Sequence, residues 1–146
     1  MSEALAVQAA HGRYVELMAE RFVCRLVDRG CGVVWVHLAG ELDIASAPRL
    51  ERMLARSELQ APLVVLDLRK LTFMDSFGAH VVAHAATRAR GKGNRLVLIR
   101  APRHVQRLLT LTGAAARIEI VEPGDSEPAI QALLHLARTE LEHAWA

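Results

Sequence analysis

The chain has 146 residues, of which 52% are hydrophobic and 23% are charged, so it can form one domain with a buried core and is not a disordered chain. Its 18 basic and 16 acidic residues give a formal net charge of +2, which does not by itself indicate nucleic-acid binding. No apolar run approaches the roughly 20 residues of a membrane span, no secretion signal is visible, and two cysteines are too few for a disulfide framework. We therefore expect a soluble, cytoplasmic protein with reduced cysteines.

The first elements are expected to be a helix and a β-hairpin. Residues 5–20 predict a helix, within an N-terminal helical extension over residues 1–21. Alternating apolar and polar residues at 21–28 predict a strand, and residues 33–39 predict a second one. Because glycines lie between these two strands, we expect them to be joined by a tight turn as a hairpin.

Helices and strands then alternate. Ser46 can cap a helix whose first turn contains Pro48. The nearly continuous apolar run at 63–68 suits a central strand that is covered on both faces. A helix after Ser76 is expected to end near Gly91. The remaining expected elements are a strand at 95–100, a short helix from Pro102 that stops at Gly113, a strand at 117–121 and a C-terminal helix at 126–145.

This order predicts an α/β fold, with a mixed sheet of four to five strands, helices packed on it and right-handed crossovers. No linker interrupts the alternation, so residues 1–146 are expected to form a single domain with its core at about 22–121. The two terminal helices would be additions to this core.

The basic residues are unevenly distributed along the chain. Residues 76–118 contain no acid and eight bases, which are Arg88, Arg90, Lys92, Arg95, Arg100, Arg103, Arg107 and Arg117. Residues 119–146 contain six acids and one base. Such a stretch can attract an acidic partner or a phosphate, or it can be a solvated face balanced in space by the acidic flanks. It has no aromatic residue after Phe77 for stacking on bases, which disfavours nucleic acid.

No catalytic or metal-binding motif is complete. His80 and His84 have helical spacing, but Val81 stands where a zinc protease needs glutamate. Ser76 has Met74 in place of the first glycine of a nucleophile elbow. We therefore predict no metal, no cofactor and no enzymatic activity.

Ser76 lies where a buried-type strand passes into an amphipathic helix, between Asp75 and Gly78. Either Asp75 or Ser76 could simply cap the helix. Alternatively, the Ser76 hydroxyl is exposed at an electropositive helix start, where a kinase could reach it and add about −1.5 to −2 charges. The residues alone leave both interpretations open.

Several segments resemble a known family in their residues, in their order along the chain and in their spacing. They are Gly40-Glu41-Leu42-Asp43, Ala47 and Leu50, Leu66-Asp67-Leu68, Leu71-Thr72-Phe73-Met74-Asp75-Ser76-Phe77-Gly78, Arg95-Leu96-Val97-Leu98 and Leu109-Thr110-Leu111-Thr112-Gly113. On these residues the chain resembles the STAS domain, and within it the bacterial anti-sigma factor antagonists, over about residues 22–121. It departs from the common pattern at Phe77, where many antagonists have a second serine or threonine.

The resemblance implies a regulatory protein that binds an anti-sigma factor and so controls sigma-factor-dependent transcription. It implies that the partner, which is also a serine kinase, phosphorylates Ser76 and thereby weakens the complex, and that a phosphatase restores it. The implied partner-binding residues are Asp43, Asp75, Ser76, Phe77 and Gly78. A homodimer, a STAS scaffold in a stress-sensing complex or transport system, and a nucleotide-binding STAS domain stay open as alternatives; direct binding to nucleic acid or membrane is not expected.

Overall fold

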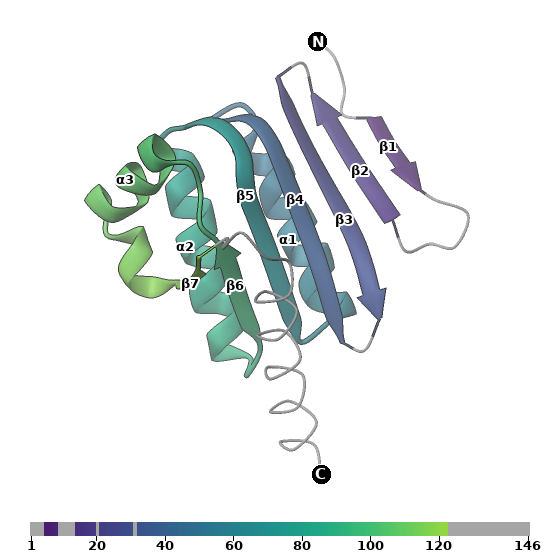
Figure 1. Ribbon diagram of the computed structural model, residues 1–146. Helices are drawn as coiled ribbons and strands as arrows, with labels where there is room; N and C mark the ends of the chain where they lie inside the picture. Colours follow the sequence, from purple (N-terminus) through teal and green to yellow (C-terminus); the bar gives the residue numbers. More distant parts are fainter. Residues whose placement is uncertain (1–4, 9–13, 20, 31, 123–146) are drawn as a thin grey trace.

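Seven strands form one sheet, and their order in the sheet is their order along the chain (Figure 1). The computed structural model describes residues 5–8, 14–19, 21–30 and 32–122. The strands are β1 (Leu5–Gln8), β2 (Tyr14–Ala19), β3 (Phe22–Gly30), β4 (Val33–Leu42), β5 (Leu63–Met74), β6 (Arg95–Ile99) and β7 (Glu119–Val121). The helices are α1 (Ala47–Gln60), α2 (Ser76–Gly91), α3 (Arg103–Leu111) and the 3₁₀-helix η1 (Ala114–Arg117).

The sheet is mixed, as predicted. Strands β1 to β4 pair antiparallel, whereas β4 to β7 pair parallel. The parallel part follows from the helical crossovers, because parallel neighbours cannot be joined by a tight turn. The predicted β3–β4 hairpin is confirmed. The expected number of four to five strands is too low, since the described residues contain seven.

The predicted helix at residues 5–20 is wrong. Its described residues form strands β1 and β2, which pair with each other, and β2 pairs with β3 through Leu17 opposite Cys24. Apolar residues in this stretch also alternate, at Leu5 and Val7 and at Val15 and Leu17, which is the spacing of a strand. Pairing with the edge of β3 therefore overrides the weak helical pattern. The C-terminal helix expected at 126–145 lies outside the described residues.

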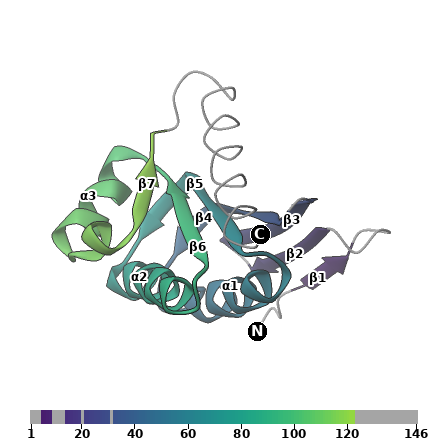
Figure 2. The same cartoon turned by 90° about the horizontal axis from the view of Figure 1, so that it is seen from below.

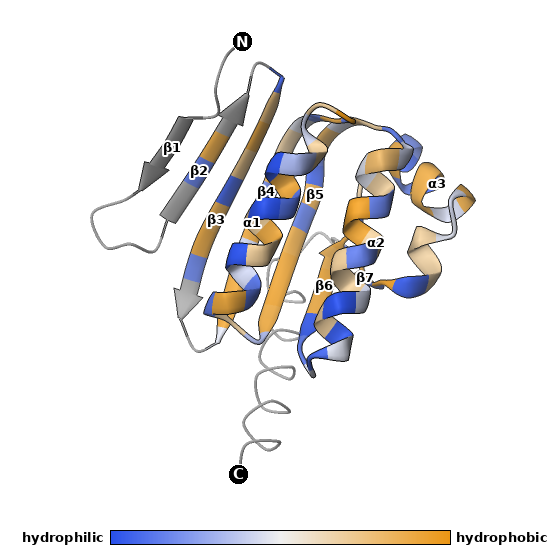
Figure 3. Cartoon of the chain, turned by 180° about the vertical axis from the view of Figure 1, so that it is seen from behind, coloured by the Kyte–Doolittle hydropathy of each residue, from blue (hydrophilic) through white to orange (hydrophobic). Residues whose placement is uncertain are grey.

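Helices α1 and α2 cover one face of the sheet (Figures 1 and 2). The apolar stripe of α1, which consists of Leu50, Met53 and Leu54, is fully buried against it. Figure 3 shows both helices with polar and apolar residues, while β5 is apolar along most of its length. None of the helices among the described residues is long and apolar enough to span a bilayer.

Strand β5 is buried on both faces over its first six residues, 63–68, as the apolar run predicts. Val65 is 1% exposed and Leu66 is 0% exposed, although successive side chains point to opposite faces. Leu66 belongs to the main core under the helices, and Val65 belongs to a second apolar cluster with Trp35 and Ile99. This double burial fixes β5 in the centre of the sheet, and with it the point at which the chain leaves the strand at Met74.

Strand β4 reaches the same end of the sheet through a close backbone approach. Gly40 has φ +91°, and a Cβ atom there would lie 2.1 Å from the Arg21 carbonyl oxygen. The neighbouring Glu41 N–H donates to that same oxygen at 2.7 Å. Only glycine fits this position, and beyond it β4 ends at Leu42, beside the end of β5.

Candidate functional site

Two polar turns meet where β4 and β5 end. One follows Leu42 and contains Asp43 to Ser46, and the other follows Met74 and begins with Asp75. The Asp75 N–H donates to the Leu42 carbonyl oxygen at 3.0 Å, which joins the end of one strand to the start of the other turn. The carboxyl ends of parallel strands are where α/β sheets commonly bind their ligands.

Asp75 binds both turns with one carboxylate. Its Oδ1 accepts from the Gly78 N–H at 3.0 Å, and its Oδ2 accepts from the Ile44 N–H at 2.9 Å. Asp75 is therefore the N-cap residue of α2, and its side chain satisfies an amide that the helix leaves unpaired. The Ser76 side chain is exposed, and its hydroxyl has no partner among the described residues. Of the two capping candidates, Asp75 takes the role.

Asp43 and Ser46 close the other turn on itself. Asp43 Oδ1 accepts from the N–H groups of Ala45 at 2.9 Å and Ser46 at 3.1 Å. The Ser46 hydroxyl accepts from the Asp43 N–H at 2.9 Å and donates to the Glu41 carbonyl oxygen at 2.8 Å. Ser46 occupies the N-cap position of α1, but its side chain makes no capping bond to the helix. The capping bond predicted for Ser46 is thus replaced by bonds back into the turn.

Gly78 lets α2 start against β4. A Cβ atom at this position would lie 2.7 Å from Leu42 Cγ and 3.0 Å from the Leu42 carbonyl oxygen. Leu42 is fully buried, so it has little room to move aside. The glycine therefore has a packing role, because it lets the start of α2 lie against Leu42 at the end of β4.

Three large apolar side chains are exposed in and beside the two turns. Ile44 is 60% exposed, Phe73 is 47% exposed and Phe77 is 54% exposed. We call Asp43, Ile44, Phe73, Asp75, Ser76 and Phe77 together the turn surface. Exposed apolar groups gathered around polar residues are typical of protein-binding sites. Ile44 and Phe73 were not among the predicted partner-binding residues. For Ile44 the signal was a large apolar residue within a polar turn, whereas Phe73 lies in β5, one residue before the strand ends.

A groove begins at Ser76 and runs beside α2. It has a volume of about 410 Å³ and is lined by Ser76, Ala79, His80, Ala83, Thr112, Gly113, Ala114 and Arg117. The first four residues come from α2, and the others come from the turn after α3 and from η1. Thr112 and Arg117 lie more than thirty positions from Ser76 in the chain, so no local pattern connects them with it.

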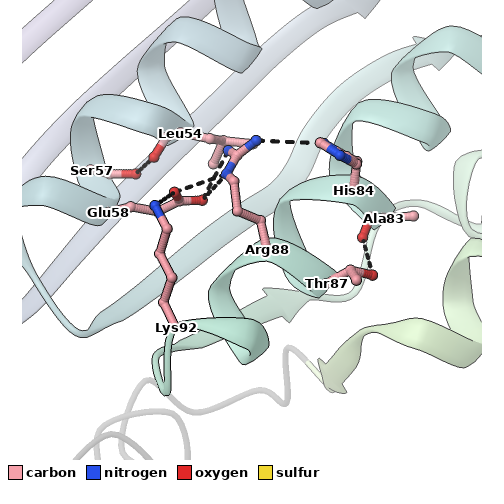
Figure 4. A network of polar contacts seen from close by, with 8 residues as sticks. All are labelled: Leu54, Ser57, Glu58, Ala83, His84, Thr87, Arg88 and Lys92. Atoms are coloured by element: carbon pink, nitrogen blue, oxygen red, sulfur yellow. Dashed lines mark hydrogen bonds and ion pairs between the residues drawn. The ribbon is translucent and has the colours of Figure 1, made fainter.

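The His80–His84 pair has an electrostatic neighbour that disfavours a metal. The two rings stack with their centroids 6.4 Å apart, and Arg88 Nη1 lies 3.5 Å from His84 Nδ1. Figure 4 shows this arginine between His84 and Glu58. A guanidinium beside an imidazole repels a bound cation, and the described residues contain no cluster of three potential metal ligands.

Ion pairs neutralise much of the basic stretch. Arg88 donates to Glu58 at 2.9 Å, and Lys92 lies 3.8 Å from the same carboxylate (Figure 4). The hydrogen bonds that Arg88 donates to Glu58 raise the pKa of Arg88 above its ordinary value. Farther along, Arg95 pairs with Glu119 and Arg100 with Glu122. The prediction that the basic stretch is a solvated face balanced by acidic residues is therefore confirmed for Arg88, Lys92, Arg95 and Arg100.

A second polar cluster links β4 and β5 away from the turns. Asp67 is buried, accepts from Arg69 Nε at 2.9 Å, and lies 2.9 Å from His37 Nδ1. Burial alone would raise the pKa of Asp67, but the hydrogen bonds from His37 and Arg69 outweigh it and hold that pKa well below its ordinary value. The cluster links β4 to β5 within the sheet.

Comparisons with known proteins agree with this fold. A curated relative, the anti-sigma-B factor antagonist of Listeria monocytogenes, is 31% identical over 86 residues, which cover 58% of this chain and 75% of the relative. The crystal structure of an anti-sigma factor antagonist from Mycobacterium paratuberculosis has a TM-score of 0.66 at 24% identity, covering 79% of this chain and 96% of that one. The unphosphorylated anti-sigma factor antagonist SpoIIAA has a TM-score of 0.64 at 19% identity, covering 77% and 96%.

The two solved structures share the fold of this chain. Because their sequence identity is below 25%, the similarity shows the fold alone. The family model described as the STAS domain matches residues 27–125, which include β4 to β7, all the described helices and the turn surface. The match spans more than half of the chain, and the Listeria relative is aligned over three quarters of its own length. The chain therefore belongs to the STAS domain family.

Proposed function

We propose that this protein is an anti-sigma factor antagonist: it binds an anti-sigma factor that is also a serine kinase, and phosphorylation of Ser76 releases it. The relative from Listeria monocytogenes carries the name anti-sigma-B factor antagonist. The observation that carries the proposal is the exposed Ser76 hydroxyl at the start of α2, without a partner among the described residues and beside the exposed ring of Phe77. This role is regulatory and needs no catalytic residue or cofactor in the chain.

The unmodified turn surface would dock on the partner. Phe77, Phe73 and Ile44 offer apolar area, and aromatic side chains are frequent at the energetically dominant positions of interfaces. Asp43 and Asp75 have their carboxylates engaged with backbone amides, so they hold the surface in one shape. A preformed surface loses little conformational entropy on binding.

Phosphorylation would act on the interface and leave the helix intact. The Ser76 oxygen bonds to the γ-phosphorus of ATP, the bond to ADP breaks, and the hydroxyl proton passes to a base of the kinase. Because Asp75 and not Ser76 caps α2, the cap survives. A negative charge at a helix start is favoured by about 0.3–1 kcal/mol. The hydrated dianion must instead be desolvated or excluded when the partner docks, and a phosphatase would reverse this.

The direct test uses two variants of the acceptor and the serine-kinase anti-sigma factor that the proposal names as the partner. In a pull-down, Ser76→Ala should bind that partner whether or not ATP is present, and Ser76→Asp should bind at least tenfold more weakly. Equal binding of the two variants would contradict the proposal.

Transfer of label from radiolabelled ATP separates the switch from a scaffold role. The wild-type chain should be labelled by the partner, and Ser76→Ala should not. Thr72→Ala is the matched control, since Thr72 is an exposed hydroxyl residue four positions before Ser76, and it should be labelled like the wild type. A chain that binds the partner but takes no label at Ser76 would be a scaffold and not a phospho-switch.

A further inference from the structure

The groove beside Ser76 is hollow because its floor is made of small residues. Ala79 and Ala83 of α2 and Ala114 of η1 are buried and line it together. Gly113, at φ +80°, turns the chain from α3 into η1 and adds no side chain. Larger residues at these positions would fill the space of about 410 Å³. Ser76 lines the same groove, so a phosphoryl group on its oxygen has room to enter.

The charged lining of this groove is basic. Its ionisable lining residues are His80 and Arg117, and no acid is among the residues that line it. Arg117 is exposed, and its guanidinium has no ion pair among the described residues. By contrast, Arg88, Arg95 and Arg100 each pair with a glutamate. Arg117 is therefore a cation in the groove lining that can pair with an anion placed in the groove, such as a phosphate.

The backbone of Arg117 is held in place by α2. Arg90 Nη2 donates to the Arg117 carbonyl oxygen at 2.7 Å, and this bond fastens the end of η1 to the helix that begins with Ser76. The hydroxyl of Thr112, which also lines the groove, already donates to the Leu108 carbonyl oxygen at 2.9 Å. Besides Ser76 itself, Arg117 and His80 thus remain as side-chain donors in the groove lining.

We propose that Arg117 binds the phosphate of phosphorylated Ser76 within this groove, with His80 as a second donor. A guanidinium can donate two parallel hydrogen bonds to phosphate oxygens. The inference rests on the proposed function, because it concerns the phosphorylated state of that site. In the phosphorylated, released form, the phosphate would then lie in the groove. Its negative charge would be balanced by Arg117 of the same chain and not by a basic residue of the partner.

The charges around the phosphate come from every element that meets there. They are Asp75 at the N-cap of α2, His80 on α2, Arg117 on η1 and Asp43 in the turn before α1. The two aspartates accept backbone hydrogen bonds. Their negative charges disfavour the second ionisation of the phosphate and so raise its second pKa. Arg117 lowers that pKa, because its positive charge favours the doubly ionised phosphate.

The test places phosphoserine at position 76 during translation and titrates it by ³¹P NMR. The second pKa of free phosphoserine is about 6. We expect Arg117→Gln to raise the pKa of this phosphate by about 0.2–0.7 relative to the wild type, the range for an exposed ion pair. Arg117→Lys should keep part of the effect. Arg107→Gln, on α3 and outside the groove lining, should leave the pKa unchanged.

The comparison is repeated with His80→Gln, so that the contribution of Arg117 is measured without the second donor. An unchanged phosphate pKa in Arg117→Gln, or an equal rise in Arg107→Gln, would overturn the inference. Since the phosphoserine is introduced by translation, this result does not depend on the kinase. Absence of labelling by the partner would instead overturn the proposed function, so the two failures are distinguishable.

Discussion

At the scale of single residues, neighbouring side chains at the start of α2 have separate tasks. Asp75 caps the helix and holds the Ile44 amide, Gly78 allows the close approach to Leu42, and Ser76 and Phe77 remain exposed. Asp75 and Gly78 thus stabilise the start of α2. The hydroxyl and the ring between them can interact with a partner at no cost to the fold.

Phe77 lets this separation be tested. Its ring is 54% exposed, so Phe77→Ala should change the free energy of unfolding by no more than about 0.5 kcal/mol. The same change should weaken binding to the anti-sigma factor about tenfold or more, as truncation of an aromatic anchor does. Isothermal titration calorimetry measures the affinity, and urea unfolding measures the stability.

Leu59→Ala is the matched control for Phe77→Ala. Leu59 is 87% exposed and lies near the end of α1, outside the turn surface. Its truncation should leave the affinity unchanged. If Phe77→Ala binds as tightly as Leu59→Ala, the turn surface does not dock through Phe77.

At the scale of elements, two glycines of α2 have different surroundings. A Cβ atom at Gly78 would contact Leu42 at 2.7 Å, whereas a Cβ atom at Gly91 would have no atom within 4 Å. Gly78→Ala should therefore destabilise the fold by about 1–3 kcal/mol through overpacking. Gly91→Ala should be neutral or stabilising by up to about 1 kcal/mol. Thermal or urea unfolding of both variants checks this, and equal stabilities would mean that Leu42 moves aside freely.

The β4–β5 pairing has a pH-dependent contribution from Asp67. Its pKa is lower in the folded chain than the ordinary value of about 3.9, so its ionised form stabilises the fold above that pH, and the contribution is lost as the pH falls below it. Asp67→Asn should be less stable than the wild type at pH 7, and the difference should shrink between about pH 5 and pH 2. Urea unfolding at several pH values measures this; parallel stability curves would contradict it.

At the scale of the whole molecule, the sequence pattern correctly predicted those helices and strands whose signals lie in neighbouring residues. The run at 63–68, the helix that begins after Asp75 and the stop at Gly113 carry their signals in neighbouring residues, and the structure confirms them. The strand pair β1–β2 was missed because its edge position beside β3 is a non-local property. The groove was missed for the same reason, since folding alone brings Arg117 to Ser76.

The seven-stranded sheet places the turn surface on a rigid support. Both turns start from strands whose ends are joined by the hydrogen bond from Asp75 to Leu42, and α1 and α2 follow directly from them. A charge added at Ser76 therefore meets a fixed surface. We expect the switch to act at the turn surface and in the groove beside it, without rearrangement of the sheet.

The most direct test of this account is the affinity of the anti-sigma factor for the chain with phosphoserine at position 76, measured by calorimetry beside the unmodified chain. The account predicts that the modified chain binds at least tenfold more weakly while its unfolding midpoint stays within a few degrees of the unmodified one. Equal affinity of the two forms, or weaker binding accompanied by unfolding of α2, would contradict it.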